Sequence, residues 1–192
     1  MDSKDTLKQH VAKTISVSDE QFDYVFSHFK PQVFKKGQMI ISAGDKVDGE
    51  YFVIDGCLKT FYINDELKMY ILQFAMPTWW ASDYNALYTG NRATLSVDCI
   101  TDAEVLYLKA QDREKLCHEI HAIEHFFRWR TNMGYVASQK RLLSLMNNDA
   151  KHRYEELLKQ YPQLYNLVPK NLIAAYLGVS RETLSRLYHS QK

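Results

Sequence analysis

The residues with the clearest chemistry lie near the carboxyl end of the chain, where arginine, glutamate and serine recur at helical spacing. At about 100° per residue, Glu182, Ser185 and Arg186 fall on one face of a helix, and Arg181 lies on its flank. Arginine donates to guanine O6 and N7 in the major groove, glutamate accepts from cytosine N4, and serine contacts bases or phosphates. This face therefore predicts contacts with duplex DNA.

The segment that must position this face is predicted to be two short helices joined by a tight turn. Ala174 is small enough to let the second helix approach, and Gly178 permits the sharp turn. Ser180 can cap the second helix, and both Ser180 and Lys170 are counted among the DNA-binding candidates. The apolar positions that would pack the pair are Ile173, Leu177, Val179, Leu184 and Leu187. The alternative is an amphipathic hairpin whose charged face is merely solvated.

Length and composition are those of an ordinary globular chain. The 192 residues are 46% hydrophobic and 24% charged, which excludes a disordered or collagen-like protein. The start is polar and no apolar run approaches the ~18 residues of a membrane span, so a cytoplasmic protein is expected. From Lys140 onward basic residues outnumber acidic ones by nine to four, which favours an anionic partner for this part of the chain.

Between Phe34 and Lys109, short β-type runs alternate with glycine-containing turns. The predicted strands are 38–42, 51–54, 57–63, 69–74, 95–100 and 104–108. Several short strands at close intervals are typical of an antiparallel barrel or jelly roll. The first thirty residues instead favour helix, with Ser18 and Gln21 as a capping box and Pro31 as the end of the segment.

A proline-free stretch from Gln111 to about Asn148 predicts one long helix. Its apolar stripe is Leu116, Ile120, Ile123 and Phe127. A helix of this length, roughly 57 Å, exceeds what a small barrel can cover, so part of the stripe is expected to pack on a second copy. The sequence thus predicts a homodimer, with a hinge at residues 147–149.

Other kinds of chemistry find less support. Three histidines with the spacing i, i+3, i+7 resemble a metal-ligand set: His118, His121 and His125. Their direction is nearly opposite to the apolar stripe, which favours a solvent-exposed face and no metal. The three cysteines contain no Cys-x-x-Cys pair, and no nucleophile elbow, phosphate loop or dinucleotide fingerprint occurs. We therefore do not expect an enzyme.

Several motifs extend over nearly the whole chain. They are Phe34-Lys35-Lys36-Gly37-Gln38-Met39-Ile40 with Gly44-Asp45, Tyr51-Phe52-Val53-Ile54-Asp55-Gly56, and Ile173-Ala174-x-x-Leu177-Gly178-Val179-Ser180-Arg181-Glu182-Thr183-Leu184-Ser185-Arg186. Together they resemble the cyclic-AMP receptor protein and fumarate-nitrate regulator (Crp/Fnr) superfamily. The resemblance implies an α+β fold: a double-stranded β-helix (jelly roll) of cyclic-nucleotide-binding type, a long dimerisation helix and a helix-turn-helix domain. It also implies base reading by Arg181, Glu182 and Arg186, and RNA polymerase as a partner.

The same resemblance implies a ligand pocket in the sensor domain. Its residues would be Ser82, Asp83, Arg92, Ala93 and Thr94. In cyclic-nucleotide binders, an arginine and small residues hold the cyclic phosphate, and a glutamate accepts the ribose 2′-hydroxyl. Asp83 is one methylene shorter than that glutamate and Ser82 replaces a glycine. A cyclic nucleotide is therefore one candidate effector beside an unknown small molecule.

The expected domains are a sensor at 1–110, a dimerisation helix at 111–148 and a helix-turn-helix domain at 149–192. The chain stops at Lys192, so the family's β-hairpin wing is not expected. The predicted function is sequence-specific, DNA-binding transcriptional regulation by a cytoplasmic homodimer with a small-molecule effector. The alternatives are a ligand-binding regulatory protein without DNA binding and a jelly-roll enzyme.

Overall fold

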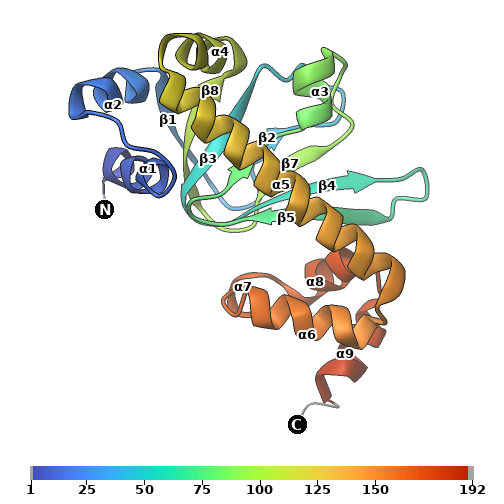
Figure 1. Ribbon diagram of the computed structural model, residues 1–192. Coiled ribbons are helices and arrows are strands. Elements are labelled where there is room, and N and C mark those ends of the chain that lie inside the picture. Colours follow the sequence, from blue (N-terminus) through green and yellow to red (C-terminus); the bar gives the residue numbers. More distant parts are fainter. Residues whose placement is uncertain (1, 190–192) are drawn as a thin grey trace. The chain divides into compact units, whose positions relative to one another are not determined.

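A computed structural model describes residues 2–189, apart from the side chains of residues 165, 188 and 189. The chain divides into two compact units. The first unit contains the chain up to Thr60 and Phe74–Met133, and the second contains Phe61–Gln73 and the chain from Gly134 onward. Most strand residues lie in the first unit, and the C-terminal helices lie in the second (Figure 1).

Two helices open the first unit, α1 (Ser3–Ala12) and α2 (Asp19–Phe26). The Gln21 N–H donates to Ser18 Oγ at 3.1 Å, and the Ser18 N–H donates to Gln21 Oε1 at 3.1 Å. The predicted capping box is therefore confirmed. Leu7 of α1 and Phe22 of α2 are fully buried in the core of this unit.

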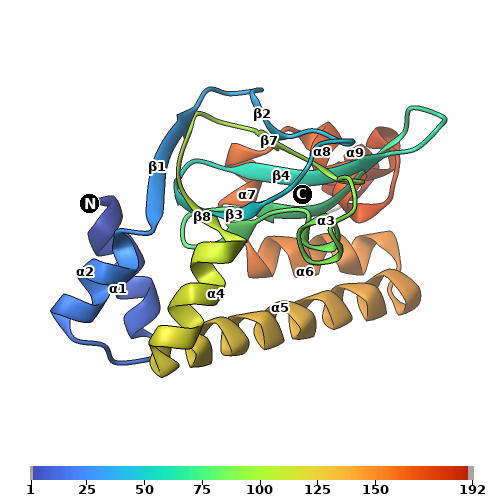
Figure 2. The ribbon, with the colours of Figure 1, turned by 90° about the horizontal axis from the view of Figure 1, so that it is seen from above.

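Two four-stranded sheets form a β-roll, with the orders β1-β8-β3-β6 and β2-β7-β4-β5 (Figure 2). The strands are β1 (Phe29–Phe34), β2 (Met39–Ile41), β3 (Gly49–Asp55), β4 (Leu58–Ile63), β5 (Met69–Ala75), β6 (Trp80–Ala81), β7 (Ser96–Cys99) and β8 (Ala103–Lys109). Strand β8 pairs antiparallel with β1 and β3. All six predicted strands are present, and the predicted α+β fold with a jelly-roll domain is confirmed.

The sequence does not predict β1, β6 or the short helix α3 (Tyr84–Thr89). Pro31 lies inside β1, where it pairs with Leu106 of β8. Since β1 is at the edge of its sheet, one side of the strand needs no partner, and a residue without an N–H is tolerated there. The prediction that Pro31 ends the helical segment is therefore wrong, because α2 already ends at Phe26 and Pro31 lies within β1.

The prediction of one helix from Gln111 to Asn148 is wrong, because the stretch forms α4 (Ala110–Glu119) and α5 (His121–Asn147). Ile120 between them has an extended backbone, with φ −129° and ψ 98°, and the chain changes direction there (Figure 2). The break allows Leu116 of α4 and Phe127 of α5 to be buried in one core. The apolar stripe, part of which was expected to pack on a second copy, is therefore largely covered by the chain itself.

Helices α6 (Ala150–Gln160), α7 (Leu164–Leu167), α8 (Lys170–Leu177) and α9 (Arg181–His189) complete the second unit. Their shared core contains Tyr154, Leu157, Leu164, Val168, Ile173, Leu177 and Leu184. Asp149 starts α6 by accepting the His152 N–H at 2.8 Å, so the chain bends where the sequence predicts a hinge. In the part of the chain that is described, no helix has both the length and the apolarity needed to cross a membrane.

Candidate functional site

The two helices α8 and α9 form the helix-turn-helix that the sequence predicts. Gly178 joins them in the left-handed region, with φ 70°. A β-carbon built on Gly178 would meet no atom within 4 Å, so backbone conformation, and not space, requires glycine here. Ala174 and Leu184 are both buried where the two helices pack, as expected for the small and apolar positions of this motif.

The start of α9 is held by Ser180, whose hydroxyl accepts the Thr183 N–H at 3.2 Å. This confirms the predicted cap. The Ser180 hydroxyl also lies 3.1 Å from the hydroxyl of Thr183. Ser180 thus fixes the first turn of the helix that carries the candidate base-reading residues.

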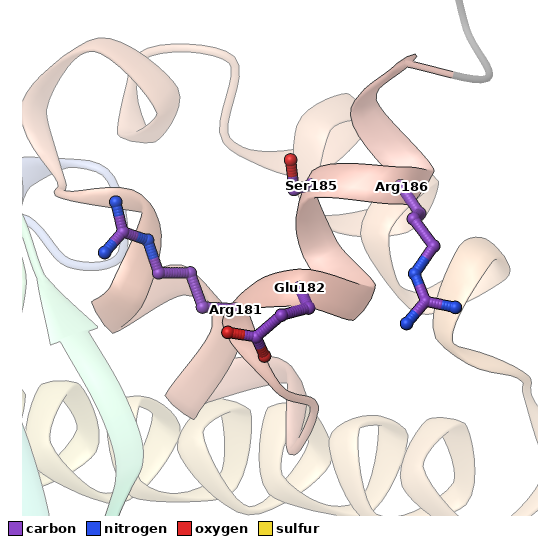
Figure 3. Close-up of a pocket in the computed structure, with 4 residues that line it drawn as sticks. All are labelled: Arg181, Glu182, Ser185 and Arg186. Carbon is purple, nitrogen blue, oxygen red and sulfur yellow. The ribbon is translucent and has the colours of Figure 1, made fainter.

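Four of the predicted DNA-binding residues line one open surface hollow: Arg181, Glu182, Ser185 and Arg186. All four side chains are exposed. Figure 3 shows Arg181 and Arg186 extending to opposite sides, with Glu182 and Ser185 between them. Neither arginine makes an ion pair or a hydrogen bond with any described residue, so both guanidinium groups are available to another molecule. Lys170 is exposed at the first residue of α8, on the other helix of the pair.

The carboxylate between these arginines is kept ionised by its surroundings. The N–H of Glu182 itself and the hydroxyl of Ser180 hold the pKa of Glu182 below its ordinary value, and Arg181 and Arg186 add to the effect. The exposed face therefore offers two fixed cations and one carboxylate acceptor. These are the groups that discriminate guanine and cytosine edges in a major groove.

One arginine that the sequence analysis missed anchors the helix pair. Arg153 of α6 donates to the carbonyl of Leu177, the last residue of α8, through Nε at 3.2 Å and Nη2 at 3.0 Å. Its Nη1 donates to the carbonyl of Asn148 at 2.7 Å. Because α8 ends in unpaired carbonyls, a guanidinium group there satisfies them and complements the helix dipole. Nothing in the local sequence around Arg153 signals this role.

In the first unit, Asp83 is the best-defined residue of the predicted sensor pocket. It has no exposed surface, and its carboxylate accepts the N–H groups of Ala86 at 3.1 Å and of Thr94 and Leu95, each at 2.9 Å. Burial acts to raise the pKa of Asp83, but these backbone N–H groups, with the Thr94 hydroxyl, hold it below the ordinary value. The carboxylate caps α3 and ties it to the segment after Gly90.

The other predicted pocket residues divide into buried and exposed ones. The hydroxyl of Ser82 donates to the carbonyl of Gly49 at 2.9 Å, and the N–H of Ala93 donates to the carbonyl of Asp45 at 2.8 Å. Arg92 and Thr94 are exposed. Since every oxygen of Asp83 is engaged inside the protein, the arrangement does not fit a cyclic nucleotide whose ribose is held by Asp83.

The comparisons with known proteins cover both units. Residues 31–119 match the model of the family described as the cyclic nucleotide-binding domain. This segment is therefore similar to a cyclic nucleotide-binding domain. A curated relative, the cyclic AMP receptor protein of Thermus thermophilus, is 24% identical over 178 residues, which are 91% of this chain and 82% of the relative. The predicted resemblance to the Crp/Fnr superfamily is confirmed.

Solved structures agree on the fold. FixK2 of Bradyrhizobium japonicum has a TM-score of 0.71 at 20% identity, over 85% of each chain. The c-di-GMP responsive global regulator CLP of Xanthomonas campestris has a TM-score of 0.71 at 12% identity, over 91% of each chain. At these identities the likeness shows the fold alone, a β-roll followed by helices. The ligand and the partner have to be inferred from the residues themselves.

The first unit also contains a buried charge cluster that the sequence analysis missed. Glu50 of β3 is 1% exposed and accepts from Arg130 at 2.7 Å, Tyr84 at 3.1 Å and Arg113 at 3.3 Å. The guanidinium carbon of Arg130 lies 4.3 Å from the centre of the Trp80 ring. The cluster joins α3, β3, α4 and α5 around one carboxylate. Only tertiary contact brings these residues together, because they are far apart in the chain.

The three histidines considered as metal ligands lie on two helices, because the chain breaks at Ile120. His118 is on α4, and His121 and His125 are on α5, all exposed. Within the described residues, no group of three or more histidine, cysteine, aspartate or glutamate side chains is placed to hold a metal ion.

Proposed function

We propose that this chain is a sequence-specific, DNA-binding transcriptional regulator that reads the major groove with α9. One observation carries the proposal: Arg181, Glu182 and Arg186 are exposed and have no ion-pair partner among the described residues, on a capped helix that follows a left-handed glycine turn. Charged side chains that only contact water would not need to be held in position by a helix-turn-helix. The Crp/Fnr resemblance agrees with this reading.

The test is selection of duplexes from a random-sequence pool, followed by fluorescence anisotropy with the enriched duplex. Arg181→Ala and Arg186→Ala are each expected to weaken specific binding by about 1 to 3 kcal/mol and to relax preference at one base pair. The matched control is Lys159→Ala, which removes an exposed cation of α6, outside the helix-turn-helix. Failure to enrich any duplex, or equal binding by the two arginine variants and the wild type, would contradict the proposal.

We also propose that the regulator is a homodimer formed through α5. The helix exposes a run of large apolar side chains: Trp129, Met133, Tyr135, Val136, Leu142, Leu143, Leu145 and Met146. Among them Trp129, Met133, Val136 and Leu143 recur at intervals of three, four and seven, the spacing of a two-stranded coiled-coil seam. A second copy of α5 is the occupant that this spacing fits. Two copies would present two recognition helices to successive major grooves, about 34 Å apart.

Sedimentation velocity tests the dimer directly. Val136→Asp and Leu143→Asp are expected to give monomers at micromolar concentration, because each places a charge in an apolar seam. Thr131→Asp is the control, since Thr131 is exposed about 200° around the helix from Trp129 and should leave the dimer intact. If the wild type is a monomer, the exposed face of α5 is not a dimer interface. That result would not affect the proposed role of α9 in DNA binding.

A further inference from the structure

Arg141 of α5 makes two contacts with different parts of the second unit. Its Nη2 donates to the carbonyl of Ile71 in β5 at 2.8 Å and to the carbonyl of Tyr176 in α8 at 2.9 Å. Its guanidinium carbon lies 3.6 Å from the centre of the Tyr176 ring. One side chain thus connects the β4–β5 hairpin to the first helix of the helix-turn-helix; the elements can be followed in Figures 1 and 2.

Each of the two carbonyls lies at a border of its element, where a donor from another part of the chain can reach it. Strand β5 is at the edge of its sheet, and Tyr176 lies in the last turn of α8, where carbonyls have no intrahelical donor. A cation at this end of α8 also complements the helix dipole. The planar guanidinium donates to two carbonyls while stacking on an aromatic ring, a combination that lysine does not offer.

The position of α8 determines the position of α9, because only Gly178, Val179 and Ser180 separate the two helices. Arg153 holds the same end of α8 through Leu177, but its contacts stay within α6, α8 and the bend at Asn148. Ser144 of α5 donates to Glu156 of α6 at 2.6 Å across that bend. Arg141 differs from Arg153 and Ser144 because one of its hydrogen bonds is made to the β4–β5 hairpin.

We propose that Arg141 is a positioning residue that couples the β4–β5 hairpin to the recognition helix, so that movement of the hairpin changes DNA affinity. This inference rests on the proposed function of α9 as the DNA-reading helix. Coupling between two sites is reciprocal: if the hairpin affects DNA binding, then bound DNA must affect the hairpin. An effect of bound DNA on the hairpin would therefore indicate that Arg141 couples the two sites, and a merely structural role would not produce it.

Hydrogen exchange of the full-length protein, with and without the duplex enriched by the wild type, provides the test. In the wild type, DNA is expected to slow exchange of amides in residues 61–73 as well as in α9. In Arg141→Ala and Arg141→Lys, protection of α9 should remain at saturating DNA while protection of 61–73 is lost. DNA affinity should fall about tenfold, within the usual range of coupling between sites. Lys140→Ala, which removes the neighbouring cation of α5, is expected to keep both effects.

The two proposals fail in distinguishable ways. If no duplex binds, the proposed function fails. Hydrogen exchange without DNA still tests whether Arg141 connects the hairpin to α8. In that case Arg141→Ala should speed amide exchange both in residues 61–73 and in α8. Equal exchange in both segments for the variant and the wild type would overturn the coupling. So would DNA binding by the wild type that leaves residues 61–73 unchanged. Should the alanine variant not fold, the lysine variant answers the same question.

Discussion

Two clusters of arginine and glutamate in this protein have the same chemistry and opposite environments. In the first unit, Glu50 is 1% exposed and is held by Arg113 and Arg130. On α9, Glu182 lies beside Arg181 and Arg186, and all three are exposed. The comparison teaches that burial, not residue type, decides whether such a cluster supports the fold or faces a partner.

The two clusters differ in free energy because one is removed from water and the other is exposed to it. Charges removed from water lose hydration, and only close partners and hydrogen bonds restore the loss, so a buried cluster tolerates no missing member. Exposed charges keep their water and are screened by salt, so the free protein gains little from pairing them. The exposed cluster is therefore free to exchange water for the groups of a nucleic acid.

The largest expected effect comes from removing the buried carboxylate. Glu50→Ala should lower the free energy of unfolding by about 3 to 5 kcal/mol, because Arg113 and Arg130 would remain buried without their counter-charge. Urea unfolding measures this. Glu182→Gln is the matched change on α9 and is expected to leave unfolding unaltered while changing DNA binding. Equal losses of stability in the two variants would contradict the claim that the buried cluster supports the fold and the exposed one does not.

Asp83 is a second buried carboxylate, and its contribution to stability can be tested by changing the pH. Its folded-state pKa lies below the ordinary 3.8, so its contribution to stability is present above about pH 4 and is lost as the pH falls through the folded-state value. Asp83→Asn should cost about 1 to 3 kcal/mol at pH 7, since N–H groups lose an ionised acceptor. Thermal unfolding between pH 3 and pH 7 should therefore depend less on pH in the variant. Parallel curves for the two proteins would contradict this role.

The smallest expected effect concerns the support of the exposed cluster. Ser180→Ala removes the cap of α9 and should cost about 1 kcal/mol, because the Thr183 N–H loses its acceptor. Ser18→Ala, which removes the corresponding cap of α2, is the matched control in the other unit. Both variants should lose similar stability, but only Ser180→Ala should weaken DNA binding. A DNA-binding loss of the same size in Ser18→Ala would show that the effect is not local.

Local chemistry explains what could be predicted. The capping box at Ser18, the cap at Ser180 and the turn at Gly178 involve residues within a few positions of one another, so their spacing alone indicates the structure. Six of the eight described strands of the β-roll were also predictable, because short β-type runs separated by turn residues repeat along the chain. The exposed face of α9 followed from helical periodicity once the helix was placed.

Six strands, the helix-turn-helix and the outward set of Arg181, Glu182 and Arg186 could be predicted from the sequence, because each depends on neighbours in the chain. Contacts between distant parts of the chain place Pro31 in an edge strand, break the helix at Ile120 and turn Asp83 inward. They also decide which arginines are buried beside Glu50 and which carbonyls Arg141 contacts. These features depend on residues distant in sequence, and the free energy of burying a charge is set by the partners that folding brings to it.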